Sequence, residues 1–149
     1  MKDNLLIEQV KAIIEDENDL IANLANISSV INMNLENINW VGFYLYKENQ
    51  LVLGPFQGKV ACTRLKHGEG VCMYALENKK TTNVEDVHQF EGHVVCDSAS
   101  QSELVVPLYI DGEPFGVLDI DAPIKNRFTK DDEETFTEIG RIIEAKLSA

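Results

Sequence analysis

Residues 103–121 read ELVVPLYIDGEPFGVLDID, and this stretch decides the fold. On both sides of Gly112, apolar residues alternate with other residues, which is the pattern of β-strands with one buried face. The alternating apolar sets are Leu104, Val106, Leu108 and Ile110, followed by Gly116, Leu118 and Ile120. A turn centred on Gly112 with an odd number of loop residues brings both sets onto one face, because a one-residue slip would send one of them to the opposite side. The sequence therefore predicts an antiparallel hairpin with one apolar face.

This register gathers three acidic side chains on the other face of the hairpin. Glu103 comes opposite Asp121, and Asp119 lies two residues back on the same side. Acidic residues at strand ends are usually solvated, whereas two in one apolar strand need partners if they are buried. Three carboxylates this close cannot all ionise at low cost, so we expect at least one of them to keep its proton near neutral pH.

Helical patterns flank this β-rich centre. From Leu5 to about Leu35 the apolar positions recur at helical spacing, with an acidic interruption at 15–19, which predicts two helices. A closing amphipathic helix is expected from about Lys130 to Leu147, with Thr129 as its N-cap. The other predicted elements are a hairpin at 38–46 and 50–56 with its turn at 47–49, a short helix at 71–78, a strand near 81–84 and an irregular stretch from 86 to 102. A loop of that length is either functional or disordered, and we interpret it as the cover of an active site.

The first hairpin also sorts its side chains onto two faces. One set is Trp40, Gly42 and Tyr44, and the set that we assign to the helix-facing core is Val41, Phe43 and Leu45. Along a straight strand, Trp40 and Tyr44 lie about 13 Å apart at about 3.3 Å per residue, so we expect them to line two walls of one cavity without stacking on each other. The predicted architecture is an antiparallel sheet with the terminal helices on one face and a polar, aromatic-edged pocket on the other.

Composition and charge exclude several classes of function. With 149 residues, the chain is one domain by the usual size prior and large enough to fold without disulfides. Its beginning lacks the basic start and apolar core of a secretory signal, and no apolar run approaches the roughly 18 residues of a membrane helix. A net charge of −12 without a basic patch disfavours nucleic-acid binding. We therefore expect a cytoplasmic protein with a small-molecule partner and no contact with membranes or nucleic acid.

Three cysteines stand at positions 62, 72 and 96. Cys96 lies in a small, polar segment before an apolar strand, where a solute can reach a thiol, and two further thiols upstream could trap its oxidised product as a disulfide. In a reducing cytosol, transient catalytic disulfides are the usual exception to the rarity of disulfides. One alternative is that the cysteines are inert and buried, which fits Cys72 best. Another is a zinc site with His67, His88 or His93, which the lack of short ligand spacings disfavours, so we expect no metal.

Five motifs resemble those of the free methionine-(R)-sulfoxide reductases, which are enzymes built on a GAF domain. The motifs are NWVGFY (39–44), GVC (70–72), EDVH (85–88), GHVVCDSAS (92–100) and GVLDID (116–121). The cysteine intervals of ten and twenty-four residues also match the family. The resemblance runs from about residue 38 to the closing helix. It implies a single α+β domain over residues 1–149, with a GAF-like antiparallel sheet, the N- and C-terminal helices on one face and a ligand pocket on the other.

The resemblance also implies roles for the cysteines. Cys96 matches the nucleophile that attacks the sulfoxide sulfur of free methionine sulfoxide, releases methionine and becomes a sulfenic acid. Cys62 matches the cysteine that then closes a disulfide with it, and Cys72 matches a third thiol that stands in or relays. Thioredoxin is the implied reductant, no cofactor is implied, and the family suggests a homodimer. Met73 and Glu69, beside Cys72, depart from the residues common in the family.

Aromatic and acidic residues receive roles in the same way. Trp40 and Tyr44 match the side chains that hold the methyl end of the substrate, while the acids at 103, 119 and 121 match those that handle its ammonium group and sulfoxide oxygen. A free thiol is only a few per cent thiolate at neutral pH, and neighbouring carboxylates lower that fraction, so activation of the nucleophile alone is insufficient. We therefore hypothesise that Glu103 or Asp121 donates a proton to the sulfoxide oxygen and that Asp119 is mainly a ligand of the ammonium group.

Two rival functions stay open from the sequence. One is a GAF-type sensor that binds a small molecule without turning it over, and the other is a redox switch whose Cys96 only records peroxide. Incubation with free methionine sulfoxide, thioredoxin, thioredoxin reductase and NADPH separates them, since only a reductase consumes NADPH in proportion to the methionine formed.

Overall fold

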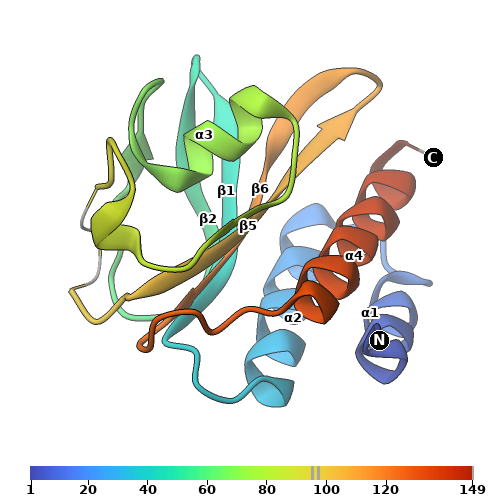
Figure 1. Ribbon diagram of the computed structural model, residues 1–149. Coiled ribbons are helices and arrows are strands. Elements are labelled where there is room, and N and C mark those ends of the chain that lie inside the picture. Colours follow the sequence, from blue (N-terminus) through green and yellow to red (C-terminus); the bar gives the residue numbers. More distant parts are fainter. Residues whose placement is uncertain (95, 97, 149) are drawn as a thin grey trace.

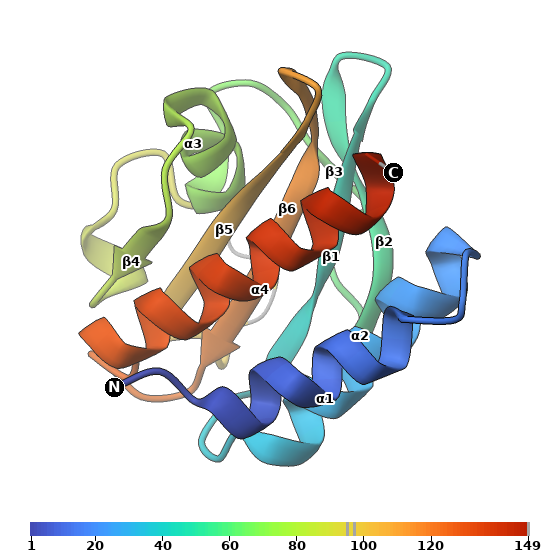
Figure 2. The same cartoon turned by 90° about the vertical axis from the view of Figure 1, so that its right-hand side faces the viewer.

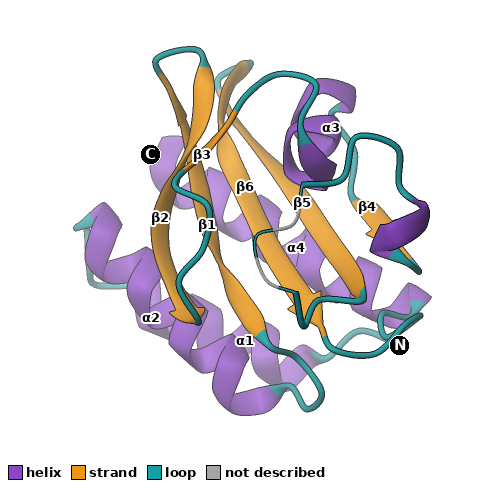
Figure 3. Ribbon diagram, turned by 90° about the vertical axis from the view of Figure 1, so that its left-hand side faces the viewer, coloured by secondary structure: helices purple, strands orange, loops and turns teal. Residues whose placement is uncertain are grey.

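An antiparallel sheet organises the computed structural model, which describes residues 1–94, 96 and 98–148. The order of its strands is β3-β2-β1-β6-β5-β4 (Figure 3). The strands are β1 (Trp40–Lys47), β2 (Gln50–Gly58), β3 (Arg64–Leu65), β4 (Thr82–Val84), β5 (Ser102–Ile110) and β6 (Glu113–Ala122). Every neighbouring pair is antiparallel. The predicted α+β class and both predicted hairpins are confirmed.

Three long helices cover one face of the sheet, and a short one covers the other (Figures 1 and 2). The long helices are α1 (Asn4–Ile14), α2 (Leu20–Asn34) and α4 (Lys130–Ser148), and the short ones are α3 (Gly70–Asn78) and the 3-10 helix η1 (Val87–Gln89). Within the described residues, no helix combines the length and the apolar character that crossing a bilayer requires.

Side-chain caps explain where the long helices begin. Asp3 accepts a hydrogen bond from the backbone N–H of Leu6 at 3.0 Å, and Asp19 caps α2 in the same way at 2.9 Å. At the start of α4, Thr129 Oγ1 accepts from the N–H of Asp132 at 3.2 Å, and the Asp132 side chain accepts from the N–H of Thr129 at 2.9 Å. This reciprocal arrangement is a capping box, so the predicted N-cap is confirmed.

The main core lies between the three long helices and the sheet. It contains Leu6, Val10, Leu24, Ile27 and Ile31 from α1 and α2, Val41, Phe43 and Leu45 from β1, Leu104, Val106, Leu108, Leu118 and Ile120 from β5 and β6, and Phe136, Ile139 and Ile143 from α4. The apolar faces predicted for both hairpins therefore point toward the helices. Their opposite faces are free to build a site under α3.

The β5–β6 hairpin keeps the predicted register but reaches it by a different route. Glu103 pairs with Asp121, as predicted. The turn, however, contains two residues, Asp111 and Gly112, whose φ angles of +52° and +82° suit a tight hairpin turn. Residue 108 pairs with 116 and residue 109 with 114, so Phe115 is the extra residue of a β-bulge. The prediction of an odd-numbered loop was wrong because the bulge supplies the one-residue shift.

Candidate active site

Three carboxyl groups meet on the sheet face opposite the long helices. Glu103 of β5 and Asp121 of β6 are direct cross-strand partners, and Asp119 lies two residues before Asp121. Glu103 is 8% exposed and Asp119 is 4% exposed, so both carboxyl groups are withdrawn from bulk water. The predicted convergence of these side chains is confirmed.

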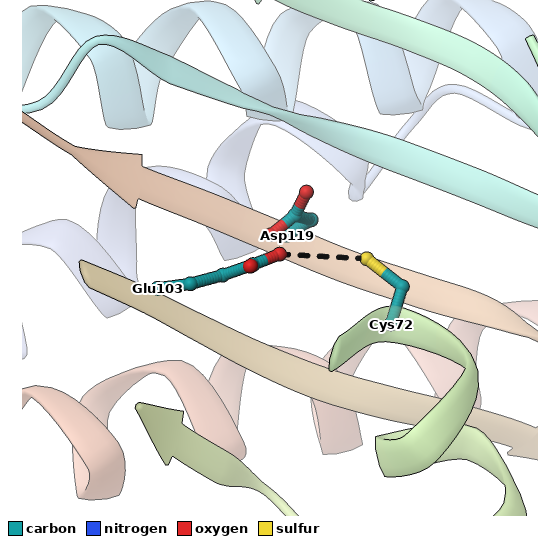
Figure 4. A group of neighbouring side chains, drawn as sticks. All are labelled: Cys72, Glu103 and Asp119. Carbon is teal, nitrogen blue, oxygen red and sulfur yellow. Dashed lines mark hydrogen bonds between the residues drawn. The ribbon is translucent and has the colours of Figure 1, made fainter. Parts of the chain in front are cut away.

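The first turn of α3 adds a buried thiol to this acidic group (Figure 4). Cys72 Sγ donates a hydrogen bond to Glu103 Oε2 at 3.7 Å. Burial raises the pKa of the Cys72 thiol well above its ordinary value, and the charges of Asp119 and Glu103 raise it further. Cys72 is therefore a neutral hydrogen-bond donor in this structure and a poor nucleophile.

Asp119 is the acid of this group whose surroundings most favour the protonated form. Burial raises the pKa of Asp119, and the charges of Asp121 and Glu103 raise it further. Its Oδ1 atom is buried without a hydrogen-bond partner in the part of the chain that the structure describes, which disfavours the ionised form. The sequence hypothesis gave the proton to Glu103 or Asp121, whereas the structure favours Asp119.

The aromatic side chains of β1 lie beside the acids. Trp40 pairs with Asp121 across the strands and Gly42 pairs with Asp119. Contrary to the prediction, the Trp40 and Tyr44 rings stack, with centroids 5.9 Å apart and planes 25° apart. Long side chains lean along the strand, and Gly42 between the two rings places no side chain in their way. Trp40 also stacks on Phe56, with centroids 5.1 Å apart.

Cys62 and Cys96 form a disulfide, with Cα atoms 5.2 Å apart. Cys62 lies between β2 and β3, and Cys96 lies in the irregular stretch before β5. This is the pair that the family resemblance implied. Tyr44 Oη donates a hydrogen bond to the backbone carbonyl of Cys62 at 2.9 Å, which links the disulfide to the aromatic wall.

The three acids, Cys72, Cys96 and the rings of Trp40 and Tyr44 line one cavity of about 40 Å³. Its lining includes Trp40, Tyr44, Ala61, Leu65, Gly70, Val71, Cys72, His93, Val94, Cys96, Ser100, Glu103, Asp119 and Asp121. Part of the predicted cover is tied to α3, because the Gly70 N–H donates to the carbonyl of Gly92 at 2.8 Å. Positions 95 and 97 of this stretch lie outside the described residues.

Comparison with known proteins assigns this arrangement to a family. The GAF domain family matches residues 17–147. The chain is 51% identical to the protein YtsP of Bacillus subtilis, over 97% of this chain and 90% of the relative. It is 44% identical to the free methionine-R-sulfoxide reductase of Escherichia coli, over 92% of this chain and 83% of the relative. The solved structure of the fRMsr of Staphylococcus aureus in complex with its substrate superposes with a TM-score of 0.92 at 51% identity, covering 97% of this chain and 94% of that one.

The chain belongs to the free methionine-R-sulfoxide reductase family. It is therefore an oxidoreductase on a GAF fold, and the resemblance stated from its motifs is confirmed. Of the residues that the motifs assigned to a reductase site, all except Cys62 line the cavity, and Cys62 reaches it through its bond to Cys96.

The cysteine–histidine zinc site considered from the sequence is not assembled in the described part of this reductase. His67 is bonded to Tyr46 and to Glu77, each at 2.9 Å, on the outer surface. The group with metal-ligand spacing that the described residues contain is Cys72, Glu103 and Asp119, whose ligand atoms lie within 4.8 Å of one another, and it includes no histidine. Both other cysteines are held in the disulfide.

Sequence reasoning missed some members of the site. His93, considered from the sequence as a possible zinc ligand, lines the cavity, as does Ser100. Ser100 accepts a hydrogen bond from the Asn39 side chain at 3.1 Å, which joins the end of the cover to the strand end of β1. Both His93 and Ser100 stand inside the motif that contains Cys96, so the motif was the signal that could have found them. Phe56 follows from no motif, because its ring reaches Trp40 from the neighbouring strand.

Proposed function

We propose that this protein reduces free methionine (R)-S-oxide to methionine, with Cys96 as the nucleophile. The observation that carries the proposal is that Cys96, bonded to a second cysteine, lines the same cavity as Glu103, Asp119 and Asp121. The choice of substrate is supported by the Escherichia coli relative, whose name specifies the free amino acid and the R form of the sulfoxide.

The lining of the cavity suits an amino acid with both of its charges. Glu103 and Asp121 can accept the ammonium group, and the stacked rings of Trp40 and Tyr44 offer an apolar wall to the methyl group. The first turn of α3 also lines the cavity, and Glu69 at its N-cap makes no side-chain capping bond. Backbone N–H groups at such a helix start suit a carboxylate. A methionine sulfoxide inside a polypeptide lacks both charges, so the free amino acid is the better ligand.

The first chemical step transfers the sulfoxide oxygen to Cys96. The Cys96 sulfur attacks the sulfoxide sulfur, and Asp119 passes its proton to the oxygen, which makes that sulfur more electrophilic. The oxygen, which carries the proton from Asp119, ends on Cys96 as a sulfenic acid, and the thiol proton of Cys96 returns to the Asp119 carboxylate. The substrate sulfur leaves as a thioether, reduced by two electrons. The raised pKa of Asp119 supports this role, because it favours the protonated form of the carboxyl.

Two further steps return the enzyme to its starting state. The Cys62 sulfur attacks the sulfenic sulfur, which forms the disulfide and releases water. The dithiol of thioredoxin then reduces the disulfide and becomes a disulfide itself. Cys96 also lines an open surface depression with Gly58, Lys59, Val60 and Ser98, through which a protein reductant can reach it. The cavity of this disulfide form is small for an amino acid, which suggests that reduction precedes substrate binding.

A coupled assay tests the proposal. The protein is incubated with thioredoxin, thioredoxin reductase, NADPH and either free methionine (R)-S-oxide, its (S) epimer or N-acetyl-methionine sulfoxide. We expect NADPH consumption equal to the methionine formed, and only with the free (R) compound. Binding of the compound without NADPH consumption would instead support a sensor.

A further inference from the structure

We propose that Trp40 and Tyr44, besides lining the cavity, are positioning residues for the cysteine that closes the disulfide. Their polar atoms hold the two ends of residues 59–62, the segment that carries Cys62, and thereby set the rate at which Cys62 reaches the sulfenic acid of Cys96. This inference rests on the proposed function, because it concerns the second step of that reaction.

Two hydrogen bonds carry the inference. Trp40 Nε1 donates to the backbone carbonyl of Lys59 at 3.2 Å, and Tyr44 Oη donates to the backbone carbonyl of Cys62 at 2.9 Å. The bonds therefore bracket the segment that leaves β2 and leads to β3. Neither bond is needed to wall a substrate cavity with an apolar ring. They give the indole N–H and the phenol hydroxyl a function of their own.

The two donors are fixed by their surroundings. Trp40 and Tyr44 are each 2% exposed, and the Trp40 ring stacks on both Tyr44 and Phe56. The chain passes close to this ring at Gly58, where an added Cβ would lie 2.5 Å from Trp40 Cδ1. A side chain held this firmly loses little conformational entropy when it forms its hydrogen bond. The position of Lys59 and Cys62 thus follows from the packing of the rings.

The hydroxyl of Tyr44 keeps its proton at neutral pH and so can donate this bond. Burial raises the pKa of Tyr44, and the charges of Asp119, Asp121 and Glu103 raise it further. The carbonyl of Cys62 can only accept a hydrogen bond. Loss of the hydroxyl therefore frees the segment at the residue that must react.

Disulfide closure depends on this placement. The Cys62 thiolate attacks Cys96 Sγ, the S–O bond breaks, and the oxygen leaves as water after taking up a proton. The Cα atoms are 5.2 Å apart in the closed form, within the range that an unstrained disulfide requires. A segment held near this distance before reaction raises the effective concentration of the attacking sulfur. If the segment is mobile, disulfide closure is slower and the sulfenic acid persists for longer.

Tyr44→Phe tests the inference, because it keeps the ring and removes only the hydroxyl. The reduced protein is oxidised with a small excess of hydrogen peroxide, which forms the Cys96 sulfenic acid without methionine sulfoxide. Disulfide closure is then followed by mass spectrometry, with dimedone as a trap for the sulfenic acid. We expect closure about three- to tenfold slower than in the parent, the effect of losing one hydrogen bond, and a larger dimedone-labelled fraction.

Tyr109→Phe is the matched control. Tyr109 Oη also donates to a backbone carbonyl, that of Leu76 in α3, at 2.5 Å. Its acceptor therefore lies outside residues 59–62, the segment that carries Cys62. We expect closure at the parental rate in this variant. If Tyr44→Phe does not fold, Trp40→Phe replaces it, with slower closure expected because the bond to Lys59 is lost.

Parental closure rates in Tyr44→Phe, or equal slowing in Tyr109→Phe, would overturn the inference. The peroxide route keeps this failure separate from a failure of the proposed function. If the parent forms no methionine from the sulfoxide, the reaction assignment fails, while the closure rates still decide whether the aromatic side chains position Cys62.

Discussion

At Asp119, burial and two neighbouring acids act on one carboxyl in the same direction. Because the backbone register of β5 and β6 forces Glu103 and Asp121 to its side, the side chain cannot escape their charge without breaking the sheet. Both effects favour the protonated carboxyl, which is the form that a proton donor to a substrate oxygen requires. The same arrangement has consequences for rate and for stability, and these can be measured separately.

Replacement of Asp119 by Asn keeps the shape of the side chain and removes its transferable proton. We expect methionine formation per enzyme to fall about 100-fold, within the range that general acid catalysis contributes. Rapid-quench assays of a single turnover measure this step without the reductant. A rate within threefold of the parent would exclude Asp119 as the proton donor.

The pH dependence of stability offers a second test of the same carboxyl. The folded-state pKa of Asp119 is raised above that of an unfolded Asp, about 3.9, so above this pH the folded protein binds more protons than the unfolded chain. The free energy of unfolding contributed by this group is therefore fully present below about pH 4 and falls as the pH rises toward the folded-state pKa. Urea unfolding between pH 4 and 8 should show a smaller decline in Asp119→Asn.

Asp111→Asn is the control for this experiment, because Asp111 lies in the exposed turn of the hairpin. Its unfolding curve should follow the parent at every pH. An unchanged slope in Asp119→Asn would mean that Asp119 is ionised in the folded protein.

The sequence could predict which residues share the site, but it could not predict which acid keeps a proton or how the aromatic rings pack. Alternation along the strands placed the acids at 103, 119 and 121 together, because side-chain direction in a strand has a period of two. Which acid keeps the proton depends on burial by α3 and the cover, which alternation does not describe. The stacking of Trp40 on Tyr44 was missed because it depends on the direction in which rings lean, not on their spacing along the strand.

At Gly42, strand β1 lies so close to strand β2 that no side chain fits between them. A Cβ at this position would lie 2.2 Å from Phe56 Cβ and 2.8 Å from the carbonyl oxygen of Pro55, so backbone would have to move. We expect Gly42→Ala to reduce the free energy of unfolding by about 3 kcal/mol, as overpacking does. Urea unfolding at neutral pH measures the change.

Gly112→Ala is a useful comparison for that variant. The turn leaves open space around Gly112, and only its positive φ opposes a side chain, so about 1 kcal/mol is expected. If Gly42→Ala lowers the free energy of unfolding by no more than Gly112→Ala does, β1 and β2 do not approach each other this closely at Gly42.

Elements bounded by local signals were predictable, and those bounded by tertiary contacts were not. Asp3, Asp19 and Thr129 cap the helices with their own side chains, so the sequence contains the start of each long helix. The bulge at Phe115 lies in an apolar run, so no polar residue marks its position. Alternation shows only that an odd number of residues separates the two apolar sets. A loop of odd length and a two-residue turn with a bulge both meet this condition. Both routes give the same register beyond it.

In the whole molecule, the main hydrophobic core and the candidate active site lie on opposite faces of the sheet. The long helices lie on one face of the sheet and α3 lies on the other (Figures 1 and 3). The main core is buried beneath the long helices, whereas Gly70, Val71 and Cys72 of α3 line the cavity. At the rim of that cavity Cys96 also lines the open depression with Val60, which is 88% exposed. This position gives the proposed protein reductant a route that does not pass through the substrate cavity.

Val60→Glu should therefore slow regeneration by thioredoxin. A carboxylate in the depression removes an apolar contact and adds a charge, and we expect the second-order rate with thioredoxin to fall about fivefold. Regeneration by dithiothreitol should change by less than twofold, since a small thiol needs no docking surface. Ile124→Glu is the control, because Ile124 is also apolar, is 45% exposed and does not line the depression. Equal effects of both substitutions would remove the depression from the regeneration step.

Association of two chains belongs to the same scale. Leu5, Ile21 and Met33 of α1 and α2 are apolar and exposed by 70%, 56% and 79%. Exposed apolar side chains favour association, and the family suggested a homodimer. We expect sedimentation equilibrium to give twice the chain mass of 16.7 kDa at micromolar concentration. A single-chain mass at that concentration would contradict this expectation.

The most direct test of the account is a single turnover of the reduced Cys62→Ser variant with free methionine (R)-S-oxide. Without a resolving cysteine in place, the account predicts one methionine per chain and one dimedone-reactive sulfenic acid, located on Cys96 by peptide mass spectrometry. The reduced Cys96→Ser variant should form no methionine in the same assay. Methionine formation by Cys96→Ser at the parental rate would contradict the central claim that the Cys96 sulfur attacks the sulfoxide.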